Sequence, residues 1–457
     1  MPNSHVRSTP LSDLVRRVDH DLVMLEPDET LNRAAMFTAD CRSGRTQVIG
    51  STRSGSPLTM FSLGTGPVHV LVLGSPHPNE PVSAVTVPEF LRVVAAEMDN
   101  AGSRSGLARF TFDVVAVWDL DGARLSTGAY RPEPDLLEYH SAFYRPAPAN
   151  QPEWTFPTTG RGPARLPETG AVMRVIDDIG PAAVVSLHNA DIAAGAYFTT
   201  RRVPPTLAAG LSRLPARFGI PLERAPADAC DWKELAPGVR EMGHSPRPEA
   251  SCSLDYAART KGAFGLATEV PQWYVTAPDA PGTLTWRRSL QAMADQAQRA
   301  IEPMASTIVC LARQEPNCPV AAAALAFLTF TNAEIARCRN SGSPDDAGTR
   351  QARWAADWVT LLRLPLRLAG LVLTLARPHP CRHPLLEAVR RHAGTVLQTM
   401  IRALSVTTHP RPVPLSRAVK VQFAAILCAA SAAAEEQVGD ANPVARARPD
   451  RRRAASP

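Results

Sequence analysis

The segment from Val68 to Pro81 constrains the fold of this chain more than any other stretch. Its first part, Val-His-Val-Leu-Val-Leu, is apolar and β-branched, which is typical of a buried strand, and Gly74 and Pro76 end it. Directly after that end stand His77 and Glu80, three positions apart, with a proline before and after the pair. One turn of helix would bring positions i and i+3 to one face. The sequence therefore predicts an imidazole and a carboxylate side by side at the end of a strand.

Such a pair can hold a divalent metal ion. Zinc accepts a mixture of imidazole nitrogen and carboxylate oxygen, and two histidines plus one glutamate with an open fourth position form a catalytic ligand set. We therefore expect His77 and Glu80 to supply two zinc ligands. The alternative is a surface turn in which a histidine and a glutamate fall three positions apart by chance. Other segments of the chain are needed to distinguish a zinc site from such a turn.

Three further apolar runs also end on polar side chains. Open α/β sheets place their sites at the carboxyl ends of strands, so these ends are expected to meet. The run Phe112–Trp118 leads into Asp119-Leu-Asp121-Gly122, the run Ala182–Leu187 ends on His188-Asn189, and the run Ala263–Pro271 carries Glu269.

Taken together, these segments resemble the M14 family of zinc carboxypeptidases (carboxypeptidase A-like metallopeptidases). The matches run in the family's order from about residue 45 to about residue 275. They are the H-x-x-E pair His77 and Glu80, the histidine after a Ser-x pair in Ser186-Leu-His188, the N-P-D-G-like Asp119-Leu-Asp-Gly122, the S-x-D-Y segment Ser253-Leu-Asp255-Tyr256 with Glu269 fourteen residues after its aspartate, and Ile49 to Leu58, where Thr52 replaces the family's serine.

The resemblance implies an α/β fold with a mixed sheet, one Zn²⁺ per chain and His188 as the third ligand. It also implies that Glu269 is the general base that takes a proton from water and passes it to the leaving nitrogen. Leu254 would make the side-chain pocket apolar, and Asp255 would orient a neighbour or line that pocket. The alternative for Leu254 and Asp255 is packing within a loop.

The chain departs from the family where digestive members carry an Asn-Arg pair that grips the substrate carboxylate, because residues 132–157 contain no such pair. The arginines available there are Arg124, Arg131, Arg145 and Arg161. Arg124 and Arg145 are candidates for oxyanion polarisation and carboxylate binding, in either order, and Arg131 is a further candidate for substrate binding. We favour Arg145 for the carboxylate because a proline follows it. Arg124 directly follows the Asp-Gly turn, so it is assigned to the oxyanion.

The predicted function is a zinc-dependent metallocarboxypeptidase that hydrolyses a C-terminal amide bond of a peptide or peptide-like substrate. Two alternatives stay open: a zinc-dependent deacylase or amidase of N-acyl amino acids or cell-wall peptides, which the missing Asn-Arg pair favours, and a non-catalytic zinc-binding homologue. The partner is then a peptide or an acyl-amino acid. Side-chain specificity is not fixed by these motifs.

Length and composition suggest one catalytic domain with additions. We expect a helical lead at 1–44, the catalytic domain at 45–311, an all-helical C-terminal appendage at 312–438 and a disordered basic tail at 439–457. Only three of the 49 basic residues are lysines and the net charge is a modest +6, so no nucleic-acid partner is expected.

The appendage is predicted from Ala/Leu/Arg-rich segments at 319–339, 349–376, 383–404 and 415–437, the second of which should kink or split at Pro365. It could form a homo-oligomer. The first residues lack an apolar signal-peptide core, and no run reaches about 18 uninterrupted apolar residues. With its cysteines in no regular pattern, the chain is expected to be soluble and cytoplasmic, with no membrane contact.

Overall fold

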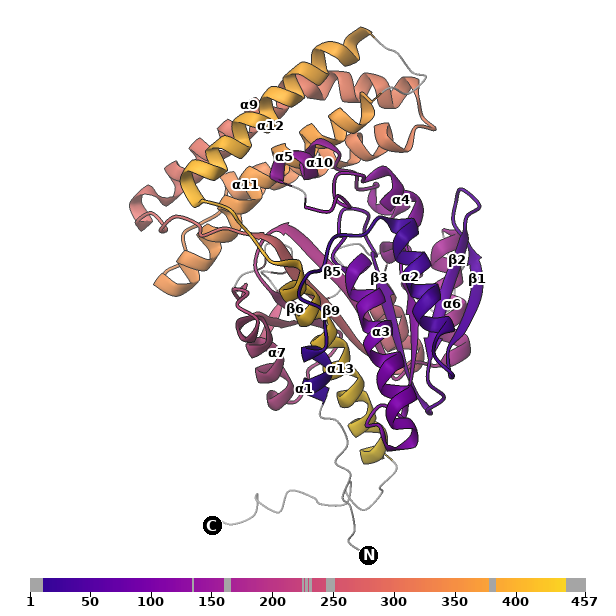
Figure 1. Ribbon diagram of the computed structural model, residues 1–457. Helices are drawn as coiled ribbons and strands as arrows, with labels where there is room; N and C mark the ends of the chain where they lie inside the picture. Colours follow the sequence, from indigo (N-terminus) through magenta and orange to yellow (C-terminus); the bar gives the residue numbers. More distant parts are fainter. Residues whose placement is uncertain are drawn as a thin grey trace, which may run out of the picture.

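The computed structural model describes residues 11–133, 135–159, 166–223, 226, 229, 232–243, 251–377 and 384–440. Its centre is a mixed ten-stranded sheet in the order β1-β2-β4-β3-β5-β9-β6-β8-β7, with β10 paired to β9 (Figure 1). The strands are β1 (Arg45–Ser51), β2 (Pro57–Leu63), β3 (Val68–Gly74), β4 (Phe110–Val115), β5 (Ala183–Ile192), β6 (Ala196–Thr199), β7 (Lys233–Ala236), β8 (Val239–Glu241), β9 (Phe264–Tyr274) and β10 (Arg411–Pro412).

The four central strands β4, β3, β5 and β9 are parallel, and the flanking pairs β1–β2, β2–β4 and β6–β9 are antiparallel. Helices cover both faces of a parallel sheet, so its strands read as near-continuous apolar runs, and β3 and β5 are accordingly buried along almost their whole length. The predicted α/β mixed-sheet fold is confirmed. The carboxyl ends of β3, β5 and β9 meet at one edge.

Two helical layers sandwich the sheet. One core joins alternate residues of β3, such as Val70 and Val72, to α1, α2, α3, α7 and α13, and a second core joins Leu71 and Leu73 to α6 and α8. Because successive side chains of β3 point to opposite faces of the sheet, this strand contributes to both cores. These helices are α1 (Leu11–Arg16), α2 (Pro27–Ala39), α3 (Ser83–Ala101), α6 (Pro167–Ile179), α7 (Pro205–Arg217), α8 (Ser253–Lys261) and α13 (Leu415–Asp440).

The remaining long helices form a bundle that lies above the sheet in Figure 1. It contains α9 (Thr283–Gln314), α10 (Pro319–Arg339), α11 (Ala347–Leu375) and α12 (Pro384–Thr408), and the short α4 (Leu120–Leu125) and α5 (Leu136–Ser141) share its core. The C-terminal helical region is therefore confirmed. Helix α11 does not split at Pro365: it is continuous and largely buried, so tertiary packing holds it despite the missing backbone donor.

The helices after residue 311 do not form one unit. Helix α13 lies beside α3 on the sheet, where Phe423 meets the Phe90 ring edge-on at a centroid distance of 5.0 Å. Its residues belong to the core of the α/β sandwich, so α9–α12 are an insertion between β9 and the last helix of that sandwich. The predicted boundary at residue 311 falls inside α9. Of the predicted tail, only its first two residues are described, as the end of α13.

Within the described residues, three helices are long and apolar enough to cross a membrane by length and composition alone. The most apolar windows of α11 and α13 are 83% and 78% buried inside the protein, whereas that of α10 is 33% buried.

Candidate metal centre

The turn after β3 places His77 and Glu80 together. The Glu80 amide donates to the His77 carbonyl at 3.1 Å, which closes a four-residue turn, and helix α3 begins only at Ser83. The predicted adjacency is present, but a β-turn rather than a helical turn provides it. Pro78 explains the difference, because its fixed φ suits the second position of such a turn.

The Asp119–Gly122 element supports this turn from the neighbouring strand. A Cβ on Gly122 would lie 2.4 Å from the Pro78 ring, so only glycine allows the two segments to approach this closely. Asp119 caps helix α4 by accepting from the Gly122 amide at 3.1 Å, and it accepts from Arg53 Nη2 at 2.9 Å. Burial raises the pKa of Asp119 to about 7, although Arg53 opposes this shift. These motif residues hold the turn in place.

Three side chains from two strand ends then converge. His77, Glu80 and His188 each offer a ligand atom, and these atoms all lie within 4.8 Å of one another. His188, near the end of β5, has its Nδ1 2.9 Å from Glu80 Oε2, and the two imidazole rings have centroids 5.1 Å apart. The three residues are 2%, 5% and 7% exposed. A residue more than a hundred positions away thus completes the pair in the turn.

The donor set fits a divalent metal ion. His77 Nδ1 is buried and has no hydrogen-bond partner among the described residues, although buried polar atoms normally have one. Burial lowers the pKa of His77 well below its usual value, and the nearby charges of Arg145, His188 and Arg367 lower it further. The imidazole is therefore neutral, which is the form that binds a metal. His188 contacts Ser186 Oγ through Nε2 at 3.0 Å, which leaves Nδ1 facing Glu80.

Glu269 lies next to this cluster on strand β9. It is the register partner of His188 in the parallel pairing of β5 with β9, so the two side chains leave the sheet on the same face. Its side chain is half-buried. The structure thus brings together four of the residues that the sequence singled out.

Of the three candidate arginines, only Arg145 reaches the cluster. Its Nη1 donates to Glu80 Oε1 at 2.8 Å and lies 3.4 Å from Asn79 Oδ1. Arg124 instead donates to Ser56 Oγ at 2.8 Å and to Asp28 Oδ1 at 2.6 Å, so its assignment to the oxyanion is not supported by its position. Arg124 sits on α4, which turns it toward α2, and Arg131 is exposed, whereas Arg161 lies outside the described residues.

The two residues expected to line the pocket lie on α8. Leu254 is 1% exposed and belongs to the core beneath the sheet, so packing describes it better than a pocket wall. Asp255 is partly buried in the first turn of α8, where its amide donates to Cys252 Sγ. Burial raises the pKa of Asp255.

Sequence reasoning missed Glu153, a buried carboxyl near the site. It is 2% exposed and accepts from Ser253 Oγ at 2.9 Å. Burial raises its pKa to about 8, and the charges of Asp255 and Glu80 add to this shift, so Glu153 is mostly protonated at neutral pH. It lies in a short 3-10 helix, Pro152–Trp154, within a proline-rich segment without periodicity, where no spacing signals its direction. Gln151, directly before this helix, was missed too; its Oε1 lies 3.5 Å from Arg145 Nη2.

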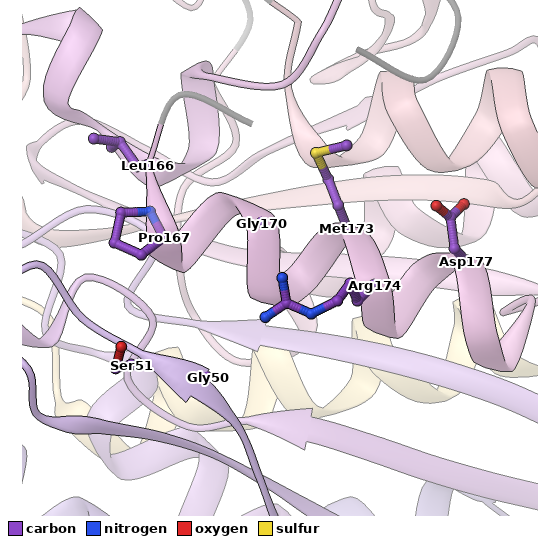
Figure 2. Close-up of a pocket in the computed structure, with 8 residues that line it drawn as sticks. All are labelled: Gly50, Ser51, Leu166, Pro167, Gly170, Met173, Arg174 and Asp177. Atoms are coloured by element: carbon purple, nitrogen blue, oxygen red, sulfur yellow. The ribbon is translucent and has the colours of Figure 1, made fainter. Parts of the chain in front are cut away.

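A separate surface cavity of about 520 Å³ lies between strand β1 and helix α6 (Figure 2). Arg174 and Asp177 point from α6 beside it, and Gly50 and Ser51 form its β1 side. None of the residues of the metal cluster lines this cavity, so it is distinct from the candidate centre.

Comparison with known proteins gives fold-level similarities. No protein-family model matches the sequence, and no curated protein sequence matches it. Among solved structures, the chain is similar to a metallo-carboxypeptidase from Burkholderia cenocepacia (16% identity, 52% of this chain and 60% of that chain, TM-score 0.34) and to carboxypeptidase A from Helicoverpa armigera (15% identity, 56% and 67%, TM-score 0.35). It is also similar to bovine thrombin-activatable fibrinolysis inhibitor (13% identity, 53% and 86%, TM-score 0.33).

Proposed function

We propose that this chain is a zinc-dependent metallocarboxypeptidase that hydrolyses the C-terminal amide bond of a peptide or peptide-like substrate. One observation carries the proposal: His77, Glu80 and His188 converge within 4.8 Å, with Glu269 in register beside His188. Two histidines and one carboxylate are the ligand set of catalytic zinc sites that keep one position open. A carboxylate outside the set can then serve as a base.

The surroundings of the ligand residues suit this role. His77 is neutral and buried, and Ser186 on His188 Nε2 fixes the ring so that Nδ1 faces Glu80. Zinc bound here would act as a Lewis acid and lower the pKa of a water molecule. Glu269 would take the proton from that water and deliver it to the leaving nitrogen. Its half-buried place on an apolar strand suits an acid–base group.

Arg145 would recognise the free carboxylate at the end of the substrate. Its guanidinium stands at Glu80, and its side chain is 21% exposed, so it can be reached from outside. A guanidinium can hold a carboxylate through two parallel hydrogen bonds, which the ammonium of lysine cannot reproduce. A chain end, rather than the middle of a peptide, would then be selected.

Metal analysis combined with a hydrolysis screen tests this function. Purified protein should contain one zinc per chain, and His77→Ala should lose it. The control is His392, a half-buried histidine on α12 whose Nε2 lies 3.2 Å from the Ala300 carbonyl oxygen; His392→Ala should keep the zinc. Equal zinc in wild type and His77→Ala would contradict the proposed centre.

The screen compares peptides with a free C-terminus, their C-terminal amides, and N-acyl amino acids. Preferential cleavage of free-acid peptides is expected. If N-acyl amino acids are cleaved and peptides are not, the function is that of a deacylase or amidase. If zinc is bound but none of these substrates is cleaved at any concentration tested, the metallocarboxypeptidase proposal fails.

A further inference from the structure

Helix α11 of the inserted bundle reaches the strand that carries His188. Arg367 on α11 donates from Nε to Asp191 Oδ2 at 2.9 Å and from Nη2 to Asp191 Oδ1 at 2.8 Å, a two-pronged contact between residues 176 positions apart. Asp191 is completely buried on β5, three residues after His188. The bundle therefore contacts strand β5 three residues after the candidate ligand His188.

The same helix also holds the loop that carries Arg145. His140 Nε2 lies 3.2 Å from Asp191 Oδ2, and the Arg367 guanidinium lies over the Phe143 ring, 5.5 Å from its centroid. One turn further along α11, a Cβ on Gly370 would lie 2.0 Å from the His140 carbonyl oxygen. This close approach fixes the segment around Phe143. Arg145, which contacts Glu80, follows Phe143 by two residues.

Thr374 adds a further contact to this segment, because its hydroxyl donates to the Phe143 carbonyl at 3.0 Å. From Arg367 to Thr374, one face of α11 therefore contacts two segments. One is the strand that carries His188, and the other is the segment that leads to Arg145; both of these residues contact Glu80. Neither contact touches the ligand atoms themselves. Their effect on the centre is through position.

The stability of the fold does not by itself account for such a pair. Two charges taken out of water lose hydration, and well-packed apolar residues of similar volume are often equally stabilising. Burial raises the pKa of Asp191, but Arg367, a hydrogen bond from His140 and the charge of Arg363 outweigh burial, so the carboxyl stays ionised. What the ionised pair adds is a fixed direction, since a guanidinium fork accepts a carboxylate in few orientations.

We propose that Arg367 is a positioning residue of the metal centre, which through Asp191, His140 and Phe143 fixes the end of β5 and the Arg145 loop against each other. This inference rests on the proposed zinc site. It assigns the inserted bundle a role in assembling that site. Residues that orient metal ligands typically change metal affinity by about 10–100-fold when they are replaced.

The test uses the full-length protein with both partners of the two-pronged pair replaced together, Asp191→Leu with Arg367→Met, so that neither is left charged without the other. The matched control is Asp357→Leu with Arg337→Met, an ion pair of 2.9 Å that lies between α10 and α11 inside the bundle. Zinc affinity is measured by competition with a chromophoric chelator, and folding by circular dichroism. We expect the site variant to bind zinc at least about tenfold more weakly and the control to stay within about twofold of wild type.

A conservative variant keeps the test decisive if the double variant does not fold. Arg367→Lys retains the charge but not the fork, so it should weaken zinc binding about threefold or more. A folded double variant, or a folded Arg367→Lys protein, with wild-type zinc affinity overturns the proposal.

Hydrogen exchange of metal-free protein separates this proposal from the proposed function. Amides in residues 136–145 and 186–192 should exchange faster in the site variant than in wild type, while those of α6 should not change. Wild type that binds no zinc would refute the proposed function, and the exchange data would still decide whether Arg367 orders these two segments. Unchanged exchange in both segments overturns the positioning role.

Discussion

His188 and Glu269 are register partners on the adjacent parallel strands β5 and β9. The proposed ligand and the proposed base therefore leave the same face of the sheet from paired positions, and the backbone ladder sets the spacing of their Cα atoms. Strand β9 is held on its other side by β6, where Ala196 pairs with Glu269. A base on a central strand is fixed more tightly than one on a loop.

This relationship predicts the behaviour of Glu269→Gln. The variant should keep its zinc, because Glu269 is not among the three clustered ligand residues, and its kcat should fall by at least about a hundredfold, since the amide cannot accept a proton. Zinc content and steady-state kinetics check both parts. The matched control is Glu234, an exposed glutamate on β7; Glu234→Gln should leave kcat unchanged. Near wild-type turnover in Glu269→Gln would refute its role as the base.

Arg145 and Arg124 give a second, paired prediction. Arg145→Lys should raise KM for free-acid peptides by about tenfold or more and change KM for C-terminal amides far less, because only the acid uses the fork. Arg124→Lys should leave both values near wild type, since Arg124 contacts Asp28 and Ser56 away from the cluster. Initial rates on matched acid and amide peptides decide the matter. An equal KM change for the two substrates would show that Arg145 does not read the carboxylate.

The sequence could predict the site residues that lie on strands or at strand ends better than those that lie elsewhere. Four of the site residues follow an apolar strand or lie on one: His77 and Glu80 follow β3, His188 lies on β5 and Glu269 lies on β9. Parallel strands bring their carboxyl ends to one edge of the sheet. Arg145 follows irregular, proline-rich backbone, where no period gives the direction of a side chain, and Arg124 lies on the short helix α4, whose direction the sequence does not give. The sequence could therefore name both arginines and favour Arg145 for the carboxylate, but it could not show that Arg124 turns toward Asp28 and Ser56.

The bundle and its contacts were less accessible to sequence analysis. An Ala-rich apolar helix has the same pattern whether it packs on a sheet or within a bundle, so α13 could not be told from α10. The pairing of Arg367 with Asp191 spans 176 positions, and neither residue belongs to a local motif. Such contacts depend on tertiary structure alone.

The position of α13 in the sandwich yields a stability prediction. Phe423→Ala should lower the free energy of unfolding by about 3–5 kcal/mol, because the ring is fully buried against Phe90 and its removal leaves a cavity. Phe330→Ala on α10 is the control: that ring is 44% exposed, and its loss should cost within about 0.5 kcal/mol. Denaturant unfolding measures both. Similar values for the two variants would contradict a core role for α13.

The buried carboxyl of Glu153 predicts how stability changes with pH. Its pKa is raised from the usual 4.5 to about 8, first by burial and then by the charges of Asp255 and Glu80, against the hydrogen bond from Ser253. Between these two pH values the folded protein keeps the proton and the unfolded chain does not. The stabilisation from this group is therefore complete below about pH 4.5 and is lost as pH rises through about 8.

Glu153→Gln should remove that dependence, because a neutral amide fills the same space without a proton to lose. Measured with a chelator present, its melting temperature should be close to wild type at pH 5 and higher than wild type at pH 9. Glu133→Gln, an exposed carboxyl, should follow wild type at both pH values. Thermal unfolding followed by circular dichroism across this range gives the comparison. If wild type and Glu153→Gln lose stability in parallel between pH 5 and 9, Glu153 does not carry its proton in the folded protein.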